Sequence, residues 1–340
     1  MIYLIGIWII RFLKIYHLFF VKSFLINYFC IRLKKANKIK LNPTNNTLSL
    51  KSIFTDFKEI TKAGLAVSVL FSSIAGYLLG FSNEFPFSWE ILLMLMVGGY
   101  CMVGASNAFN QVIEKDLDAL MDRTKNRPVP SGRMSVNTAL IIASLLTVVG
   151  LTLLYLINPK TAMFGAISIF LYVSLYTPLK TKTPLSVFVG AFPGAIPFML
   201  GWVAATGNFG IEAGTLFLIQ FFWQFPHFWS IGWFLYDDYE KAGFFMLPTG
   251  KKDDKTALQT ILYTVWLIVA SLLPVLGYTG QLKISIIAAI LVFLLGLWML
   301  YYALRLRKLG TTKAAKSLML ASVFYITMLQ LIYIVDKFIR

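Results

Sequence analysis

The chain has 340 residues, of which 58% are hydrophobic and only 14% are charged, and its mean hydropathy is +0.73. Soluble domains are roughly 45–50% apolar, so this composition excludes an ordinary soluble protein and indicates one that crosses a lipid bilayer several times. The net charge is +16. In membrane proteins such an excess of Lys and Arg usually lies in the cytoplasmic loops, so we expect no nucleic-acid partner. The two cysteines, Cys30 and Cys101, lie in unrelated settings and exclude a disulfide framework.

The first 50 residues differ in character from the rest of the chain. Residues 1–29 are apolar and aromatic but are interrupted by basic side chains. This segment could be an interfacial helix, a poor tenth span or translated upstream sequence; we favour the interfacial helix, followed by a polar linker at 37–50. We therefore divide the chain into an N-terminal extension, residues 1–50, and a membrane domain, residues 51–340.

Nine stretches of the membrane domain approach the roughly 20 apolar residues that a transmembrane helix needs. They are residues 63–81, 91–112, 137–157, 162–176, 185–206, 213–235, 256–276, 284–304 and 317–335. The fourth stretch is the shortest. We predict an all-α polytopic membrane protein in which about nine transmembrane helices surround a central cavity.

Basic residues gather in alternate loops of this predicted topology. One side of the membrane collects the basic residues of loops 115–133, 180–182, 241–255 and 305–316, whereas the loops of the opposite side hold only Lys160 and Lys283. Because loops rich in Lys and Arg face the cytoplasm, we expect a multi-pass protein of the cell inner membrane with its C-terminus outside.

A ladder of oxygen-bearing side chains follows the second predicted span, on the cytoplasmic side. Asn110, Glu114, Asp118 and Asp122 lie four residues apart, a spacing that stacks side chains along one face of a helix. Oxygen donors are the ligands that Mg²⁺ requires. Four cations that could pair with phosphate oxygens follow at once: Arg123, Lys125, Arg127 and Arg133. Carboxylates beside guanidinium groups at a membrane surface indicate a site for a metal-bound diphosphate.

Two further polar clusters occur at cytoplasmic helix ends. Tyr176 and Lys180 are one helical turn apart, and Asp238 belongs to an acidic run at residues 236–241. Most acidic residues at a helix end are solvated surface, and that alternative stays open for much of this run. If the helices form a ring, however, the ladder and the acidic run can face each other. They could then hold Mg²⁺ against a diphosphate, with Lys180 and an arginine neutralising the remaining charge.

The sixth predicted span is rich in aromatic residues between positions 221 and 233. These residues could form an interfacial belt or the wall of a site for a large flat or isoprenoid ligand. His227 lies among them, where a hydrogen-bonded structural histidine is more common than one that binds a ligand.

Several motifs together resemble a known family. The order N-x-x-N-x-x-x-E-x-D-x-D-x-x-M-D-R-T-x-x-R-P-x-P-x-G occupies residues 107–132, YTPLK occupies 176–180, GAIP begins at Gly194, and WQ-x-PHFW begins at Trp223. This set is similar to the protoheme IX farnesyltransferase (heme O synthase) branch of the UbiA-type intramembrane prenyltransferases. The resemblance spans most of residues 63–340 and leaves residues 1–50 outside.

The resemblance implies roles for particular residues. The implied catalytic residues are Asn110, Glu114, Asp118 and Lys180, and the implied metal ligands are Asn110, Glu114, Asp118 and Asp238. The residues implied to bind the diphosphate are Lys62, Arg123, Arg127, Tyr176 and Lys180. His227 is implied to contact heme. Phe234 stands where the second acidic motif of the superfamily has its first acid, which implies that a second metal ion is held differently here.

The resemblance also implies an activity. It is the transfer of farnesyl from farnesyl diphosphate to a vinyl group of heme b with addition of water, which gives heme O and diphosphate, with Mg²⁺ as cofactor. The implied partners are the two substrates, the lipid bilayer, and a downstream heme A synthase or terminal oxidase assembly. Two alternatives stay open: a UbiA-type prenyltransferase acting on a quinone precursor, and a secondary transporter, whose broken helices and acidic residues would be similar.

Overall fold

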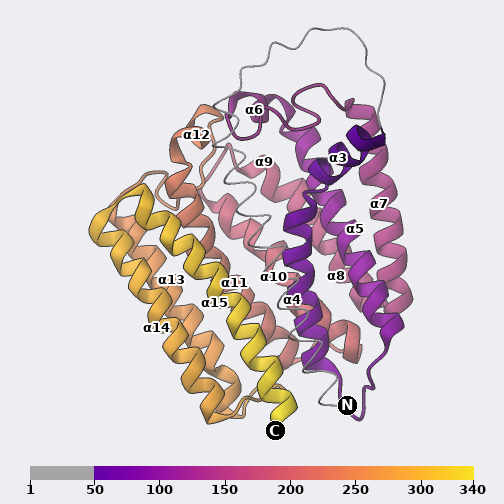
Figure 1. Cartoon of the computed structure of the whole chain (residues 1–340), viewed down its shortest axis with the longest axis vertical. Helices are drawn as coiled ribbons and strands as arrows, with labels where there is room; N and C mark the ends of the chain where they lie inside the picture. The colour runs from indigo at the N-terminus through magenta and orange to yellow at the C-terminus, as the bar shows by residue number, and fades with distance from the viewer. Residues whose placement is uncertain (1–49) are drawn as a thin grey trace.

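The structure is a computed structural model that describes residues 50–340. Within these residues the chain forms helices and connecting turns, with no strand (Figure 1). The extension predicted for residues 1–50 lies outside the described residues except for Leu50. The helices are α3 (Leu50–Ile60), α4 (Ala63–Gly80), α5 (Trp89–Ile113), α6 (Lys115–Leu120), α7 (Val136–Ile157), α8 (Pro159–Phe170), the π-helical turn η2 (Leu171–Tyr176), α9 (Thr177–Leu179), α10 (Leu185–Thr206), α11 (Ile211–Phe234), α12 (Tyr236–Lys241), α13 (Asp254–Leu272), the 3₁₀ turn η3 (Leu273–Leu276), α14 (Ile286–Leu309) and α15 (Thr312–Ile339).

The number of long helices agrees with the sequence pattern. In the described part of the chain, eight helical segments have the length and hydropathy of a membrane span, and α8, η2 and α9 join into one of them, Pro159–Leu179. α11 has 24 residues and is the ninth long helix, but Gln220, Gln224 and His227 lower its hydropathy. The prediction of an all-α membrane protein with about nine spans is confirmed.

The helices are arranged in two flanks around a middle group. α13, α14 and α15 form one flank, α5, α7 and α8 form the other, and α4, α10 and α11 lie between them (Figure 1). The short helices α3, α6, α9 and α12 gather at one end of the bundle, and the C-terminus lies at the opposite end. The polar clusters of the sequence therefore share one end of the molecule, which we call the polar end.

Glycine permits the closest approach within the middle group, between α4 and α10. A Cβ atom on Gly201 would lie 1.9 Å from the carbonyl oxygen of Ser73, and one on Gly76 would lie 2.0 Å from that of Phe198. The two backbones therefore touch, as membrane helices do where small residues face each other. Gly201 therefore serves close packing, and α10 continues as one helix through Pro193 and Pro197.

Side-chain caps mark where most of the long helices begin. In each case a side-chain oxygen accepts a hydrogen bond from an amide three residues on, which stabilises a helix by about 1 kcal/mol. The capping residues are Ser88, Ser135, Asn158, Asp253, Ser285 and Thr311. α4 is an exception, because it begins at Lys62 without a side-chain cap.

Candidate active site

The ladder of the sequence begins in α5 and crosses a break in the helix. α5 ends at Ile113 and α6 begins at Lys115, because Glu114 departs from helical geometry at φ −93° and ψ 12°. The register nevertheless persists, since the amide of Glu114 donates to the Asn110 carbonyl (2.9 Å) and the amide of Asp118 donates to the Glu114 carbonyl (2.7 Å). The side chains of Asn110, Glu114 and Asp118 are all buried. The structure thus keeps these three residues in one column.

Asp122 does not belong to this column. It follows the end of α6, its side chain is 65% exposed, and its carboxylate pairs with Lys125 and Lys241 at 2.6 Å each. Hydrogen bonds from these two ammonium groups lower the pKa of Asp122 to about 2. The expectation of four stacked residues is therefore correct for three and wrong for Asp122, because α6 ends before it.

Both buried carboxylates of the column are paired with cations, one from the loop after α6 and one from a distant part of the chain. Lys180 donates to Glu114 Oε1 at 2.7 Å, and Arg127 donates to Asp118 Oδ2 at 2.7 Å. Asp118 Oδ1 is buried and has no hydrogen-bond partner in the described part of the chain. A buried carboxylate oxygen without a partner is costly, so it marks a position where a ligand would be stabilising.

Lys180 lies in a pocket of aromatic rings. Its Nζ is 4.5 Å from the ring centroid of Tyr176 and 5.6 Å from that of Phe244, and its backbone carbonyl accepts from the amide of Phe245 at 2.7 Å. Tyr176, expected to bind diphosphate, thus contacts Lys180 through its ring. The prediction that Tyr176 and Lys180 act together is consistent with this contact.

A second lysine completes the group of cations. Lys62 has φ 48°, the only positive φ of a non-glycine residue in the described chain, a strained conformation of the kind that clusters at functional sites. Burial lowers the pKa of Lys62 well below its usual value, and repulsion from Arg127, Lys180 and Arg123 lowers it further against the attraction of Glu114. Arg127, Lys180 and Arg123 therefore lie close enough to Lys62 to repel its charge, and such a concentration of positive charge favours binding of a multivalent anion.

The acidic run of α12 meets the loop after α6. The carboxylate of Asp238 accepts hydrogen bonds from the backbone amides of Asp122 (2.8 Å) and Arg123 (3.3 Å) and lies 3.5 Å from Lys241 Nζ. The guanidinium of Arg123 lies over the Tyr239 ring, 5.5 Å from its centroid. The structure therefore brings together the first and third polar clusters, as the sequence led us to expect.

The contacts of Asp238 bear on its predicted role as a metal ligand. Both of its oxygens are engaged by backbone amides, and among the described residues no group of three His, Cys, Asp or Glu side chains is close enough to hold a metal ion. Each oxygen keeps a second acceptor site beside its amide hydrogen bond, and metal ligation by Asp238 stays a prediction.

His227 forms contacts of a structural kind. Its Nδ1 lies 2.8 Å from the Ser322 hydroxyl of α15, and its ring stacks on Trp223 at 4.7 Å between centroids. The indole of Trp223 donates to the Ser322 carbonyl at 2.6 Å. These bonds join α11 to α15, so the hydrogen-bonded interpretation holds, and contact with heme stays a prediction.

Three supporting residues were missed by reasoning from the sequence. Asn107 donates to the Thr61 carbonyl and Gln111 to the carbonyls of Glu59 and Ile60, which fixes the end of α3 just before Lys62. Thr177 accepts a hydrogen bond from Asn110 Nδ2 at 3.2 Å. Asn107 was visible as part of the quoted motif, but its partner in α3 depends on tertiary contact.

The column is chemically suited to a hard divalent cation. The side-chain atoms that could bind a cation are all oxygens, from Asn110, Glu114 and Asp118. Of these, Asp118 Oδ1 is a buried acceptor without a partner in the described part of the chain. The adjoining cations would pair with the phosphate oxygens of a diphosphate held there. The residues present therefore fit Mg²⁺ together with a diphosphate.

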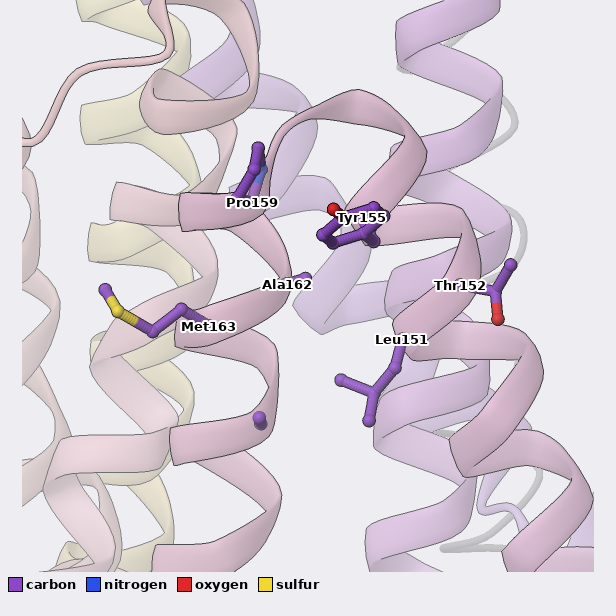
Figure 2. Close-up of a pocket in the computed structure, with 7 residues that line it drawn as sticks. Leu151, Thr152, Tyr155, Pro159, Ala162 and Met163 are labelled. Carbon is purple, nitrogen blue, oxygen red and sulfur yellow. The ribbon is translucent and has the colours of Figure 1, made fainter.

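A separate groove of 490 Å³ lies between α7 and α8, away from the polar end. Its lining is mainly apolar and comes from both helices, with Leu151 and Tyr155 on α7 and Ala162 and Met163 on α8 (Figure 2). None of the residues that line it is charged, so this groove lacks the groups that the predicted chemistry requires.

Comparison with known proteins shows the family of the chain. The sequence pattern of the UbiA prenyltransferase family matches residues 69–327. A protoheme IX farnesyltransferase of Flavobacterium johnsoniae is 78% identical over 300 residues, which cover 88% of this chain and 100% of that protein.

Two solved structures share the fold. A structure of digeranylgeranylglyceryl phosphate synthase has a TM-score of 0.69 at 18% identity, covering 84% of this chain and 98% of its own. A UbiA homologue from Archaeoglobus fulgidus bound to GPP and Mg²⁺ has a TM-score of 0.58 at 14% identity, covering 82% and 99%. Together with the sequence matches, these findings show that the chain belongs to the UbiA prenyltransferase family, in its protoheme IX farnesyltransferase branch.

Proposed function

We propose that the chain transfers the farnesyl group of farnesyl diphosphate to a vinyl group of heme b. The bond between the farnesyl C1 carbon and the diphosphate oxygen breaks, and diphosphate leaves with the electron pair. A carbon–carbon bond forms to one vinyl carbon, and water adds its hydroxyl to the other with release of a proton. The products are heme O and diphosphate.

One observation carries this proposal: two buried carboxylates in the Asn110 column are held by Lys180 and Arg127. Buried ion pairs contribute little to stability, because desolvation offsets their attraction, and breaking one leaves a costly unpaired charge. This chain is 78% identical to a protoheme IX farnesyltransferase. The two pairs therefore support a site in which the lysine and the arginine bind a diphosphate and the two carboxylates bind a metal cation.

The pairs suggest how the site changes when substrate enters. Lys180 and Arg127 can turn from Glu114 and Asp118 to the diphosphate oxygens, which frees the two carboxylates to face a cation. Each charge then keeps an opposite partner throughout, so no buried charge is left alone during the exchange. Lys62 and Arg123 add positive charge where the leaving diphosphate develops its negative charge, which lowers the barrier to ionisation of the allylic substrate.

Mg²⁺ would be held by Asn110, Glu114 and Asp118, and when bound it supplies charge neutralisation on the departing diphosphate. We propose Asp238 as a ligand of a second ion, with Tyr176 orienting Lys180 through its ring. His227 is proposed as a heme contact. Asp118 is the residue whose unpartnered Oδ1 supports the metal assignment most directly.

The distribution of charge supports a topology. We propose that the polar end faces the cytoplasm of the cell inner membrane, where farnesyl diphosphate is available, and that the C-terminus is outside. The C-terminus and the polar end lie at opposite ends of the bundle (Figure 1). Heme O released into the bilayer would pass to a heme A synthase or a terminal oxidase assembly.

The test is extraction of heme from cells that lack their own heme O synthase, with and without this chain. The proposal predicts a new heme heavier than heme b by one farnesyl group and one hydroxyl group, seen by mass spectrometry. A prenylated quinone precursor in place of this heme would identify a different prenyltransferase. No prenylated product of either kind, with the protein present in the membrane, would contradict the proposal.

A further inference from the structure

Thr177 connects the column of α5 to the segment that carries Lys180. Its hydroxyl accepts a hydrogen bond from Asn110 Nδ2 at 3.2 Å and donates one to the Tyr172 carbonyl at 2.8 Å. Asn110 and Thr177 are 1% and 2% exposed, so water does not compete for these bonds. The contact joins two residues that are 67 positions apart.

The chemistry of a hydroxyl fixes which way the Asn110 amide points. A threonine hydroxyl has one proton to donate, and here the Tyr172 carbonyl takes it. Towards Asn110 the hydroxyl can therefore only accept, so the amide atom facing Thr177 must be the nitrogen. The amide oxygen then lies on the other side of the group, and it is the only atom of this side chain that can bind a cation.

The π-helical turn explains why Thr177 faces α5. Pro178 follows Thr177 and would meet the Ser174 carbonyl in an α-helix, where it also has no amide proton to donate. The widened turn η2 (Leu171–Tyr176) accommodates this, and the Thr177 amide donates to Tyr172, five residues back. Such turns often occur at functional sites, where they change the direction of a side chain.

We infer that Thr177 is a positioning residue that turns the Asn110 amide oxygen towards the metal-bound diphosphate. This inference rests on the proposed function, and it assigns to Thr177 no contact with the reacting atoms. Without the hydroxyl, the amide could rotate by half a turn and present its NH₂ group, which repels a cation. Loss of such an orienting hydrogen bond typically weakens metal affinity by about 10- to 100-fold.

The test compares Mn²⁺ binding by purified variants in the presence of inorganic diphosphate, followed by electron paramagnetic resonance. Thr177→Val keeps the shape and removes the acceptor, and Thr177→Ser keeps the hydroxyl. Thr264→Val is the matched control, because Thr264 is also fully buried and its hydroxyl only donates to the Thr260 carbonyl of its own helix. The thermal midpoint without ligands shows whether each variant is folded.

We expect Thr177→Val to raise the Mn²⁺ dissociation constant about 10- to 100-fold, with Thr177→Ser restoring most of the affinity and Thr264→Val leaving it unchanged. In an Asn110→Asp background the effect of Thr177→Val should largely disappear, because a carboxylate presents an oxygen in either orientation.

Three results would overturn the inference. They are wild-type affinity in folded Thr177→Val, an equal loss in Thr177→Ser, and failure of both Thr177→Val and Thr177→Ala to accumulate while Thr264→Val accumulates, since the hydroxyl would then serve folding. If the wild-type protein itself bound no Mn²⁺ with diphosphate and made no heme O, the proposed function would fail instead. The two failures are therefore distinguishable.

Discussion

The two ends of the helical bundle use charged side chains in different ways. At the end that carries the C-terminus, charges mainly serve the backbone: Lys337 donates to the carbonyls of Leu79 and Phe81, and Asp336 accepts from the amide of Ser285 as well as pairing with Arg340 one helical turn away. At the polar end, Glu114 and Asp118 pair instead with the side chains of Lys180 and Arg127. A charge that holds a helix end has a fixed task, whereas two paired side chains can exchange partners when a ligand arrives.

This difference separates charged side chains with a structural role from those that can exchange partners. It distinguishes acidic residues that would look equivalent in the sequence. Asp238 lies at the polar end within an acidic run, yet its carboxylate serves backbone amides. Glu212 at the opposite end does the same for the amide of Gln281 at 3.0 Å. Substitutions at both ends can test whether only the charges that exchange partners are needed for heme O formation.

The largest effect is expected from Glu114→Gln and Asp118→Asn. Each removes a negative charge that the metal ion requires, so heme O formation should fall by at least about 10²–10³-fold. The neutral amides keep hydrogen-bonding oxygens for Lys180 and Arg127, so the proteins should still reach the membrane. The measurement is heme O by mass spectrometry, normalised to the amount of protein on a blot.

Glu212→Gln is the control at the opposite end and should leave the rate unchanged. If Glu114→Gln and Asp118→Asn both made heme O at the normal rate under saturating Mg²⁺, the column would not be the site.

Lys180→Ala should come next in size. Its ammonium is expected to pair with diphosphate, so the KM for farnesyl diphosphate should rise by about tenfold or more, while the KM for heme changes little. Lys337→Ala serves as the comparison, because it removes a charge that holds the end of α4 and should lower thermal stability without changing either KM. A larger effect of Lys180→Ala on heme than on farnesyl diphosphate would contradict the assignment.

Asp238→Asn should have a smaller but informative effect. The asparagine oxygen can still accept from one of the two backbone amides, so the thermal midpoint should fall only slightly, by the equivalent of about 1 kcal/mol. A loss of activity that higher Mg²⁺ concentration restores would support ligation of a second ion. A fall in stability with unchanged Mg²⁺ dependence would show that Asp238 only joins α12 to the loop after α6.

Much of the fold and part of the site could be predicted from the sequence. Hydropathy located the nine long helices, since each must bury its backbone in lipid, and the four-residue spacing identified Asn110, Glu114 and Asp118. The end of α6 at Leu120 could not be predicted, because neither glycine nor proline marks it. As a result, Asp122 was placed in a column that it does not join.

The partners of the column were also beyond prediction. Lys180 is 66 positions from Glu114, and Thr177 is 67 from Asn110, so these contacts depend on how α5 packs against the segment that contains η2. Sequence spacing reports neighbours on one helix and says nothing about which side chain of another helix will meet them. The resemblance to a family indicated which residues act together, but not the ion pairs that they form.

The smallest effect is expected from removal of residues 1–50. None of the column residues or their named partners belongs to this segment, so a chain beginning at Lys51 should complement a strain without heme O synthase nearly as well as the full chain. Its amount in the membrane should be measured on the same blot, since the basic residues of the segment could assist attachment to the membrane surface. Normal membrane levels without heme O would place part of the site in residues 1–50.

The exchange of ion pairs at the polar end is tested most directly by calorimetric titration of inorganic diphosphate into the purified protein, with and without Mg²⁺. Without the metal ion, Lys180 and Arg127 remain paired with Glu114 and Asp118 and are not free for the anion. Binding should therefore be at least about tenfold tighter with Mg²⁺, and by linkage diphosphate should tighten Mg²⁺ binding by the same factor. Equal affinity for diphosphate with and without Mg²⁺ would contradict the exchange.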